Sequence, residues 1–273
     1  MATHVELLCR CASAARADEA MTTAEREVRR FERIFSRFIK SSDIQRLNNE
    51  RAGEVCAELL DVVAFAMAAR EATGGRFDPT VYDALTRSGA ATGKAAHWVP
   101  GNVRIDRARR RIELAPGTRL DLGAIVKGWC ADRACARLAT VGSCLVNAGG
   151  DIALRTVEGD TAWPVGVGSR NRVLDLKVGG VATSSQSSRK WVRSGPGGSD
   201  TRHIIDPATG EPSASDASSV TVIARNATVA DVWATALVTV RAEEAIQIAD
   251  AQRLACLIER RDGSSLTSAA FTR

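Results

Sequence analysis

Amphipathic helices alternate along this chain with apolar segments too short to be helices, and this alternation limits the folds it can adopt. The first helix is marked by apolar residues at spacings of three and four: Met21, Ala24, Val28, Phe31, Phe35 and Phe38. A second helix is predicted over about residues 54–72, and Gly74-Gly75 marks its end because glycine commonly follows a helix C-terminus. Three more helices are expected at 127–141, 229–240 and 242–252.

The segments between the helices read as short strands. Residues 102–106 and 110–114 alternate apolar and polar residues around a basic tip, which predicts a hairpin. Further strands are expected at 144–146, 152–154, 163–168, 173–178, 181–184, 219–225 and 254–259. This order favours an α+β fold of mixed sheets with flanking helices over a doubly wound sheet. Because no repeat or linker divides the chain, we expect residues 1–273 to form one domain, or two interlocked lobes.

Two common nucleotide-binding signatures are missing from the sequence. The stretch from Gly123 to Lys127 resembles part of a P-loop, but the lysine is followed by Gly128 and Trp129 instead of Ser or Thr. No G-x-G-x-x-G stretch opens a helix after a strand, so a Rossmann site is not expected either. Any nucleotide bound by this chain is therefore held in another way.

Charge and hydropathy give little reason to expect nucleic acid or a membrane as partner. The net charge of +5 comes from short, scattered arginine clusters, and the longest, Arg107 to Arg111, fits the solvated tip of the hairpin. No stretch approaches the roughly 20 apolar residues that a membrane-spanning helix needs. We therefore predict neither nucleic-acid binding nor membrane insertion.

The seven cysteines indicate a reducing compartment. Their number is odd, they form no C-x-x-C pair, and several lie in apolar settings such as Cys144-Leu145-Val146. The first residues, Met1 to Glu6, have neither the basic nor the apolar region of a signal peptide. The chain as written is expected to be cytoplasmic, and exported if a leader has been removed.

Asp231 and Thr235 lie four residues apart in a predicted helix, so their side chains share one face. Carboxylate and hydroxyl oxygens are hard ligands that suit Mg²⁺, which binds few protein groups together with substrate phosphates. The same residues also fit a structural role. Asp231 would then be a favourable first-turn charge, and the Thr235 hydroxyl would bond to a backbone carbonyl.

Six short motifs rich in Asp, Gly, Thr and Pro follow one another in a fixed order. Each alone is ordinary turn chemistry. They are Gly75-Arg76-Phe77-Asp78-Pro79-Thr80, the stretch from Asp121 to Gly128, Asn147-Ala148-Gly149-Gly150-Asp151, Ala182-Thr183-Ser184-Ser185, the stretch from His203 to Gly210, and the stretch from Ala230 to Ala236. In this order, with Ser41-Ser42-Asp43 and Leu47-Asn48 before them, they resemble the ApbE family of flavin transferases. The resemblance runs from about Ser36 to Leu237.

The resemblance implies the site residues. Mg²⁺ would be held by Asp231, Thr235 and the backbone carbonyl of Ala124, with Ala234 close by. His203 resembles the catalytic base suggested for the family, and Asp231 would also be catalytic. The remaining matches are FAD-contacting positions: Arg76, Phe77, Asp78, Asp121, Lys127 and Ile205.

The resemblance also implies the reaction. Family members use Mg²⁺ to move FMN from FAD onto a Thr or Ser hydroxyl of an acceptor protein, releasing AMP. If water attacks instead, the same site would be an FAD pyrophosphatase that yields FMN and AMP. The sequence does not separate the transferase from the pyrophosphatase. A non-catalytic flavin-binding protein is an alternative of a second class, and it would release no AMP.

Overall fold

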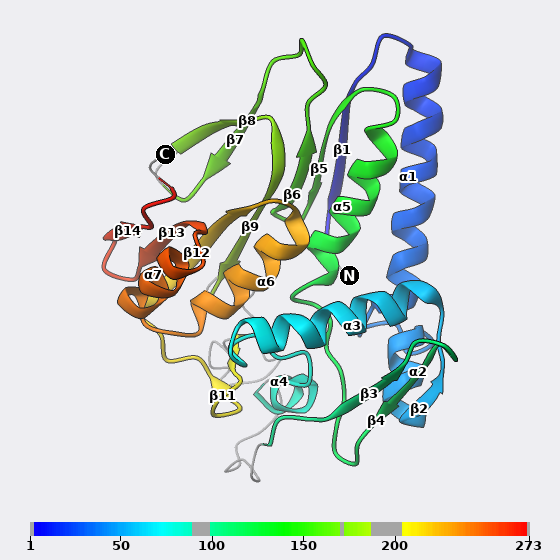
Figure 1. Ribbon diagram of the computed structural model, residues 1–273, viewed down its shortest axis with the longest axis vertical. Coiled ribbons are helices and arrows are strands. Elements are labelled where there is room, and N and C mark those ends of the chain that lie inside the picture. Colours follow the sequence, from blue (N-terminus) through cyan, green and yellow to red (C-terminus); the bar gives the residue numbers. More distant parts are fainter. Residues whose placement is uncertain (1–2, 89–98, 170–171, 187–203, 272–273) are drawn as a thin grey trace, which may run out of the picture.

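The computed structural model describes residues 3–88, 99–169, 172–186 and 204–271 (Figure 1). Its centre is a seven-stranded sheet in the order β1-β5-β6-β9-β12-β13-β14, in which every neighbouring pair is antiparallel. The strands are β1 Val5–Arg10, β5 Ser143–Ala148, β6 Asp151–Arg155, β9 Val178–Ser185, β12 Ala217–Ala224, β13 Ala255–Arg260 and β14 Ser265–Thr267.

Both faces of this sheet are covered, and alternate residues of each strand serve opposite faces. In β5, Cys144 and Val146 pack with helix residues, whereas Leu145 packs in a cluster with Trp163 on the other face. That second face is covered by the hairpin of β7 Trp163–Val167 and β8 Arg172–Leu176. In β5, which is covered on both sides, five of the six residues are buried.

Four helices cover the first face and its edge. In Figure 1, α5 and α6 cross in front of the sheet, and α1 runs beside α5. The Asn226 side chain caps α6 by accepting a hydrogen bond from the Val229 amide. The bounds are α1 Ala14–Phe35, α5 Val126–Leu138, α6 Ala227–Val238 and α7 Ala242–Ala251.

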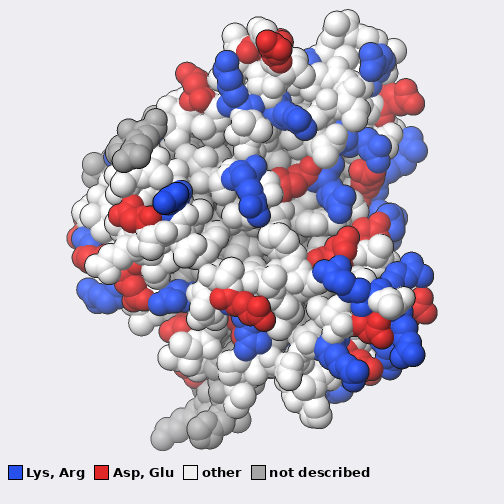
Figure 2. Space-filling view, viewed as in Figure 1, with Lys and Arg blue, Asp and Glu red and all other residues white. Residues whose placement is uncertain are grey.

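The remaining elements lie below α5 and α6 in Figure 1, with α3 running across them. Apolar residues of α3 belong to the same core cluster as residues of α5 and α6, so no separate core divides this part from the sheet. Figure 2 shows basic and acidic side chains lying next to one another over the small sheet β2-β4-β3, where Arg110 pairs with Glu54. The bounds are α2 Asp43–Glu50, β2 Ala52–Glu54, α3 Ala57–Ala72, α4 Tyr82–Ser88, β3 Val103–Asp106 and β4 Arg111–Leu114; the short hairpin β10 Ile205–Asp206 and β11 Glu211–Pro212 completes the fold.

The predicted α+β class is confirmed: mixed helices and antiparallel sheets make up the described chain. Every helix and strand predicted above is present, and apart from the start of the first helix the boundaries are shifted by up to three residues. Gly74 and Gly75 have φ of 60° and 79°, as expected for a glycine stop after α3. Within the described ranges, no helix combines the length and apolarity required to cross a membrane.

One expectation about the first helix is wrong. The spacing places Phe38 on the apolar stripe, but α1 ends at Phe35 and Phe38 is 47% exposed. The helix also starts earlier than expected, at Ala14, because Ser13 caps it by accepting from the Arg16 amide. The chain after α1 turns away from the helical course, and this turn brings Arg37 and Phe38 to the pocket described below.

Candidate active site

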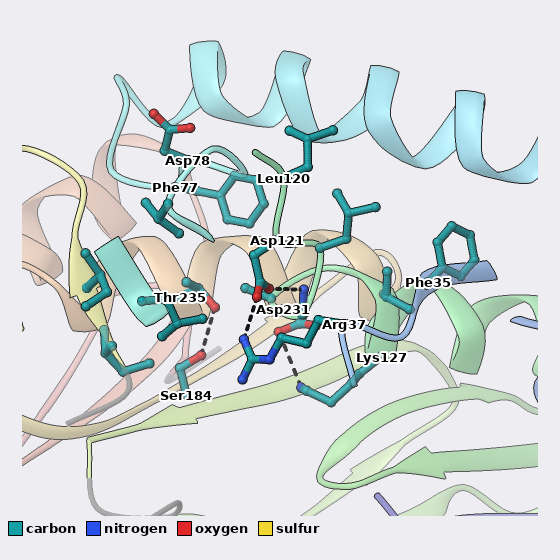
Figure 3. Close-up of a pocket in the computed structure, with 18 of the residues that line it drawn as sticks. Phe35, Arg37, Phe77, Asp78, Leu120, Asp121, Lys127, Ser184, Asp231 and Thr235 are labelled. Atoms are coloured by element: carbon teal, nitrogen blue, oxygen red, sulfur yellow. Dashed lines mark hydrogen bonds and ion pairs between the residues drawn. The ribbon is translucent and has the colours of Figure 1, made fainter. Parts of the chain in front are cut away.

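A pocket lies where α6, the start of α5, the end of β9 and the turn after α1 meet (Figure 3). Residues before α4 and residues of β10 close its other sides. These segments are far apart in the sequence, and the motifs singled out above supply most of its wall. Among the described residues, three cations line it: Arg37, Arg76 and Lys127.

Asp121 is held in a fixed place at the wall of the pocket. Its Oδ2 lies 2.5 Å from the Arg37 guanidinium, and its Oδ1 accepts a hydrogen bond of 2.7 Å from the Gly123 amide. The preceding residue, Leu120, exchanges two backbone hydrogen bonds with the buried side chain of Asn48 on α2. This double contact fixes the segment that leads from Asp121 into α5.

Lys127 joins two carboxylates that come from different elements. Its ammonium pairs with Asp151 at the start of β6 and lies 3.6 Å from Oδ1 of Asp231 on α6. Asp151 is fully buried, and its Oδ1 has no hydrogen-bond partner among the described residues. Burial raises the pKa of Asp151 to about 8, the Asp231 carboxylate acts in the same direction, and the Lys127 ammonium opposes both.

Asp231 and Thr235 lie on one face of α6 and both reach the pocket, as their spacing predicts. Asp231 is 2% exposed, and its Oδ2 accepts a hydrogen bond of 3.4 Å from the Gly128 amide. The Thr235 hydroxyl lies 3.1 Å from the hydroxyl of Ser184 on β9. The side-chain oxygens of Asp231 and Thr235 therefore face the pocket from α6, and the hydroxyl oxygen of Ser184 lies beside that of Thr235.

The oxygen donors at this place fit a hard cation such as Mg²⁺. Asp231 offers a carboxylate and Thr235 a hydroxyl, and Ala124 also lines the pocket. The described residues contain no group of three or more His, Cys, Asp or Glu side chains that could enclose a metal. A site with a single carboxylate leaves positions for phosphate and water, as Mg²⁺ usually requires. Ala234 is fully buried in the core and does not form part of the pocket wall.

The stretch before α4 brings its three predicted residues to the pocket in different ways. Phe77 is buried, and its ring forms part of the pocket wall. Arg76 reaches across to α7 and pairs with Glu244 at 2.9 Å. The Asp78 carboxylate already has partners within the protein: it lies 3.1 Å from Arg70 and accepts two hydrogen bonds from Thr80.

Ile205 on β10 also lines the pocket and is 6% exposed. His203, the predicted base, lies outside the described residues. Ile204, the next residue along the chain, is described and lines the pocket.

Two charged residues of the site were not predicted as site residues. Arg37 belongs to none of the motifs, and its partner Asp121 follows 84 residues later. Asp151 ends the Asn147–Asp151 motif, and a carboxylate directly after two glycines at a strand end is the signal that could have identified it. Ser184 lies in the fourth motif, but only the fold shows that its hydroxyl contacts Thr235.

Comparison with known proteins gives one consistent result. The model of the ApbE family matches residues 1–258. The FAD:protein FMN transferase of Escherichia coli K12 is 25% identical in an alignment covering 86% of this chain and 74% of that protein. Among solved structures, the ApbE protein of Thermotoga maritima is 28% identical and superposes with a TM-score of 0.80, covering 99% of this chain and 95% of that one.

The flavin transferase ApbE from Vibrio cholerae superposes with a TM-score of 0.77 over 100% of this chain and 96% of that one; at 23% identity it supports the fold alone. The family match covers nearly the whole chain, and residues from all six motifs line one pocket. The chain belongs to the ApbE family.

Proposed function

We propose that this chain is a Mg²⁺-dependent FAD:protein FMN transferase that moves FMN from FAD to a Thr or Ser hydroxyl of an acceptor protein and releases AMP. The observation that carries the proposal is the meeting of Asp231 and Thr235 with Lys127 and Asp121 in one pocket. Relatives that bear the transferase name support it.

The reaction exchanges one bond to phosphorus for another. The acceptor oxygen forms a bond to the phosphorus of the FMN half, the bond from that phosphorus to the AMP oxygen breaks, and the hydroxyl proton leaves. When bound, Mg²⁺ would neutralise charge on the diphosphate and on the departing AMP. Asp231, Thr235 and the carbonyl of Ala124 are the residues that would hold it.

The other residues bind and orient the substrate in this proposal. The Lys127 ammonium offsets diphosphate charge, and Asp151 and Asp231 hold that ammonium in place. Arg37 holds Asp121 against the pocket wall. Arg76, Phe77, Asp78 and Ile205 complete the FAD-binding surface. His203 would accept the proton of the attacking hydroxyl.

We also propose that the enzyme and its acceptor are cytoplasmic. All seven cysteines lie among the described residues, and all are free thiols in the structure. Free thiols in this number are typical of a reducing compartment.

The test is to incubate the protein with FAD and Mg²⁺, with and without a candidate acceptor encoded by a neighbouring gene, and to measure AMP and protein-bound flavin. AMP together with covalent flavin on the acceptor supports the transferase. AMP without any acceptor means that the chain is an FAD pyrophosphatase. Flavin binding with no AMP in either sample means that it is a flavin-binding protein.

A further inference from the structure

The start of α6 is held by a carboxylate from another helix. Asp132 of α5 accepts hydrogen bonds of 2.9 Å from the amides of both Ala227 and Thr228, and one of 2.5 Å from the Thr228 hydroxyl. Asn226 accepts from the next amide, that of Val229. The first three amides of α6, which have no partner within their own helix, are therefore all satisfied, two of them by α5.

Two glycines let α6 approach the elements that flank it. A Cβ atom at Gly128 of α5 would lie 2.4 Å from the Ala227 carbonyl oxygen, and one at Gly180 of β9 would lie 2.0 Å from the Ala227 amide nitrogen. Gly128 and Asp132 are one turn apart, so they present one face of α5 to α6. Ala227 is thus held between a helix, a strand and a carboxylate.

The same face of α6 continues into the pocket. Asp231 lies one turn after Ala227 and contacts the Gly128 amide and Lys127, and Thr235 lies one turn further and contacts Ser184. A shift at the start of the helix would therefore displace both proposed Mg²⁺ ligands relative to Lys127. Asp132 itself does not line the pocket.

We propose that Asp132 is a positioning residue for the metal site: by fixing the start of α6 on α5, it sets where Asp231 and Thr235 lie relative to Lys127. The inference rests on the proposed function, in which these two side chains hold Mg²⁺. The carboxylate of Asp132 suits this role, since a negative charge at a helix N-terminus is favoured by both the free amides and the helix dipole.

Asp216 provides a matched control. It accepts a hydrogen bond of 2.9 Å from the Ala242 amide at the start of α7, a helix that carries no proposed ligand. Both D132A and D216A remove a carboxylate from a helix start, and thermal unfolding measures the stability that each variant loses. The metal is probed with Mn²⁺, by the EPR signal of the free ion, and with the Mg²⁺ concentration that gives half-maximal AMP release from FAD.

We expect D132A to weaken Mn²⁺ binding, and to raise the half-maximal Mg²⁺ concentration, by about 10- to 100-fold, the loss typical when a residue that orients metal ligands without touching the metal is removed. D216A should bind Mn²⁺ as the unmodified protein does. If D132A does not fold, T228V removes the Thr228 hydroxyl while leaving Asp132 in place, and D132N keeps one acceptor oxygen; both should shift metal binding in the same direction by less.

Metal affinity in D132A equal to that in D216A would overturn the inference, as would equal affinity in T228V, D132N and the unmodified protein. Failure of the proposed function looks different, because the unmodified protein, given FAD and the acceptor, would then put no covalent flavin on the acceptor. The Mn²⁺ titration of D132A against D216A still decides the inference in that case, since it requires no turnover. Absence of Mn²⁺ binding by the unmodified protein would overturn the inference together with the metal site.

Discussion

The Lys127 ammonium lies 3.6 Å from Oδ1 of Asp231, and this contact joins α5 to α6 inside the pocket. Asp151 pairs with the same ammonium from the sheet side. Asp231 is therefore placed between a cation and the pocket, where it can share its oxygens with a metal ion. The arrangement gives separate roles to the carboxylate and to the ammonium, and each role can be tested alone.

Replacing Asp231 by alanine should abolish AMP release while the protein stays folded. The variant removes the one charged side chain among the proposed Mg²⁺ ligands, and Lys127 keeps Asp151 as a partner. AMP is measured by chromatography at low and high Mg²⁺, and folding by circular dichroism. Asp175, an exposed residue of β8, gives the control Asp175→Ala. Near-normal activity of the Asp231 variant at limiting Mg²⁺ would show that the metal assignment is wrong.

Replacing Lys127 by methionine should weaken FAD binding more than riboflavin binding. A hydrogen bond to a charged group contributes about 1.5–3 kcal/mol, so a roughly 10- to 100-fold loss of FAD affinity is expected. Riboflavin has no diphosphate and should bind as before. Fluorescence titration measures both, with Lys177→Met, at an exposed turn, as control. An equal loss for the two ligands would mean that Lys127 supports the fold of the pocket and makes no diphosphate contact.

Local patterns in the sequence predicted those parts of the fold that depend on local physics. Helical stripes and short strands were located correctly because side-chain periodicity reports burial directly. β1 was not predicted, although Val5 and Leu7 are its inward-facing residues. Its partner β5 follows more than 130 residues later, and short segments of this kind become strands through pairing that no local pattern reveals. Phe38 was misplaced for the opposite reason: its spacing continued the stripe after the helix had ended.

The candidate site could be predicted only where its residues fall in motifs. Asp121, Lys127, Asp231 and Thr235, which the resemblance singles out, all line one pocket. Arg37 could not be predicted, because its importance comes from a contact with Asp121 that exists only in the folded chain. Asp151 differs from Arg37 in that it ends one of the motifs, but its burial and its pairing with Lys127 depend on how β6 lies against α5.

Replacing His203 by alanine should slow AMP release in the presence of acceptor by roughly 10²- to 10⁴-fold, the usual contribution of a positioned general base. FAD affinity should change little, since the proposed role concerns the acceptor proton. His4, an exposed residue directly before β1, gives the control His4→Ala. If the variant loses most of its FAD affinity but keeps its turnover number, His203 positions the ligand and is not the base.

All seven cysteines should titrate as free thiols in the denatured protein, purified without reductant and with oxidation blocked at lysis. In the native protein the buried thiols should react slowly, because burial raises the pKa of Cys130, and raises that of Cys256 to about 12. The Sγ atoms of Cys135 and Cys144 lie 3.2 Å apart, so a missing pair of thiols would be sought there first. Recovery of a native disulfide would argue against a cytoplasmic enzyme.

Replacing Gly180 by alanine should destabilise the protein and impair the metal site together. The added Cβ would lie 2.0 Å from the Ala227 nitrogen and 2.4 Å from its Cα, and backbone atoms at the start of a helix cannot move aside as a side chain can. Overpacking of this kind costs about 1–3 kcal/mol of unfolding free energy. Relief of the clash would push α6 away from β9 and carry Asp231 and Thr235 with it.

Chemical denaturation measures the stability of the Gly180 variant, and the Mg²⁺ dependence of AMP release measures its site. Gly166 on β7 has no atom within 4 Å of the position of an added Cβ, so Gly166→Ala is a control that should stay within about 0.5 kcal/mol of the unmodified protein. A Gly180→Ala variant with normal stability and normal Mg²⁺ dependence would show that α6 is not held against β9 as closely as the structure indicates. Lower stability with unchanged Mg²⁺ dependence would show that α6 keeps its ligands in place even when its first turn is displaced.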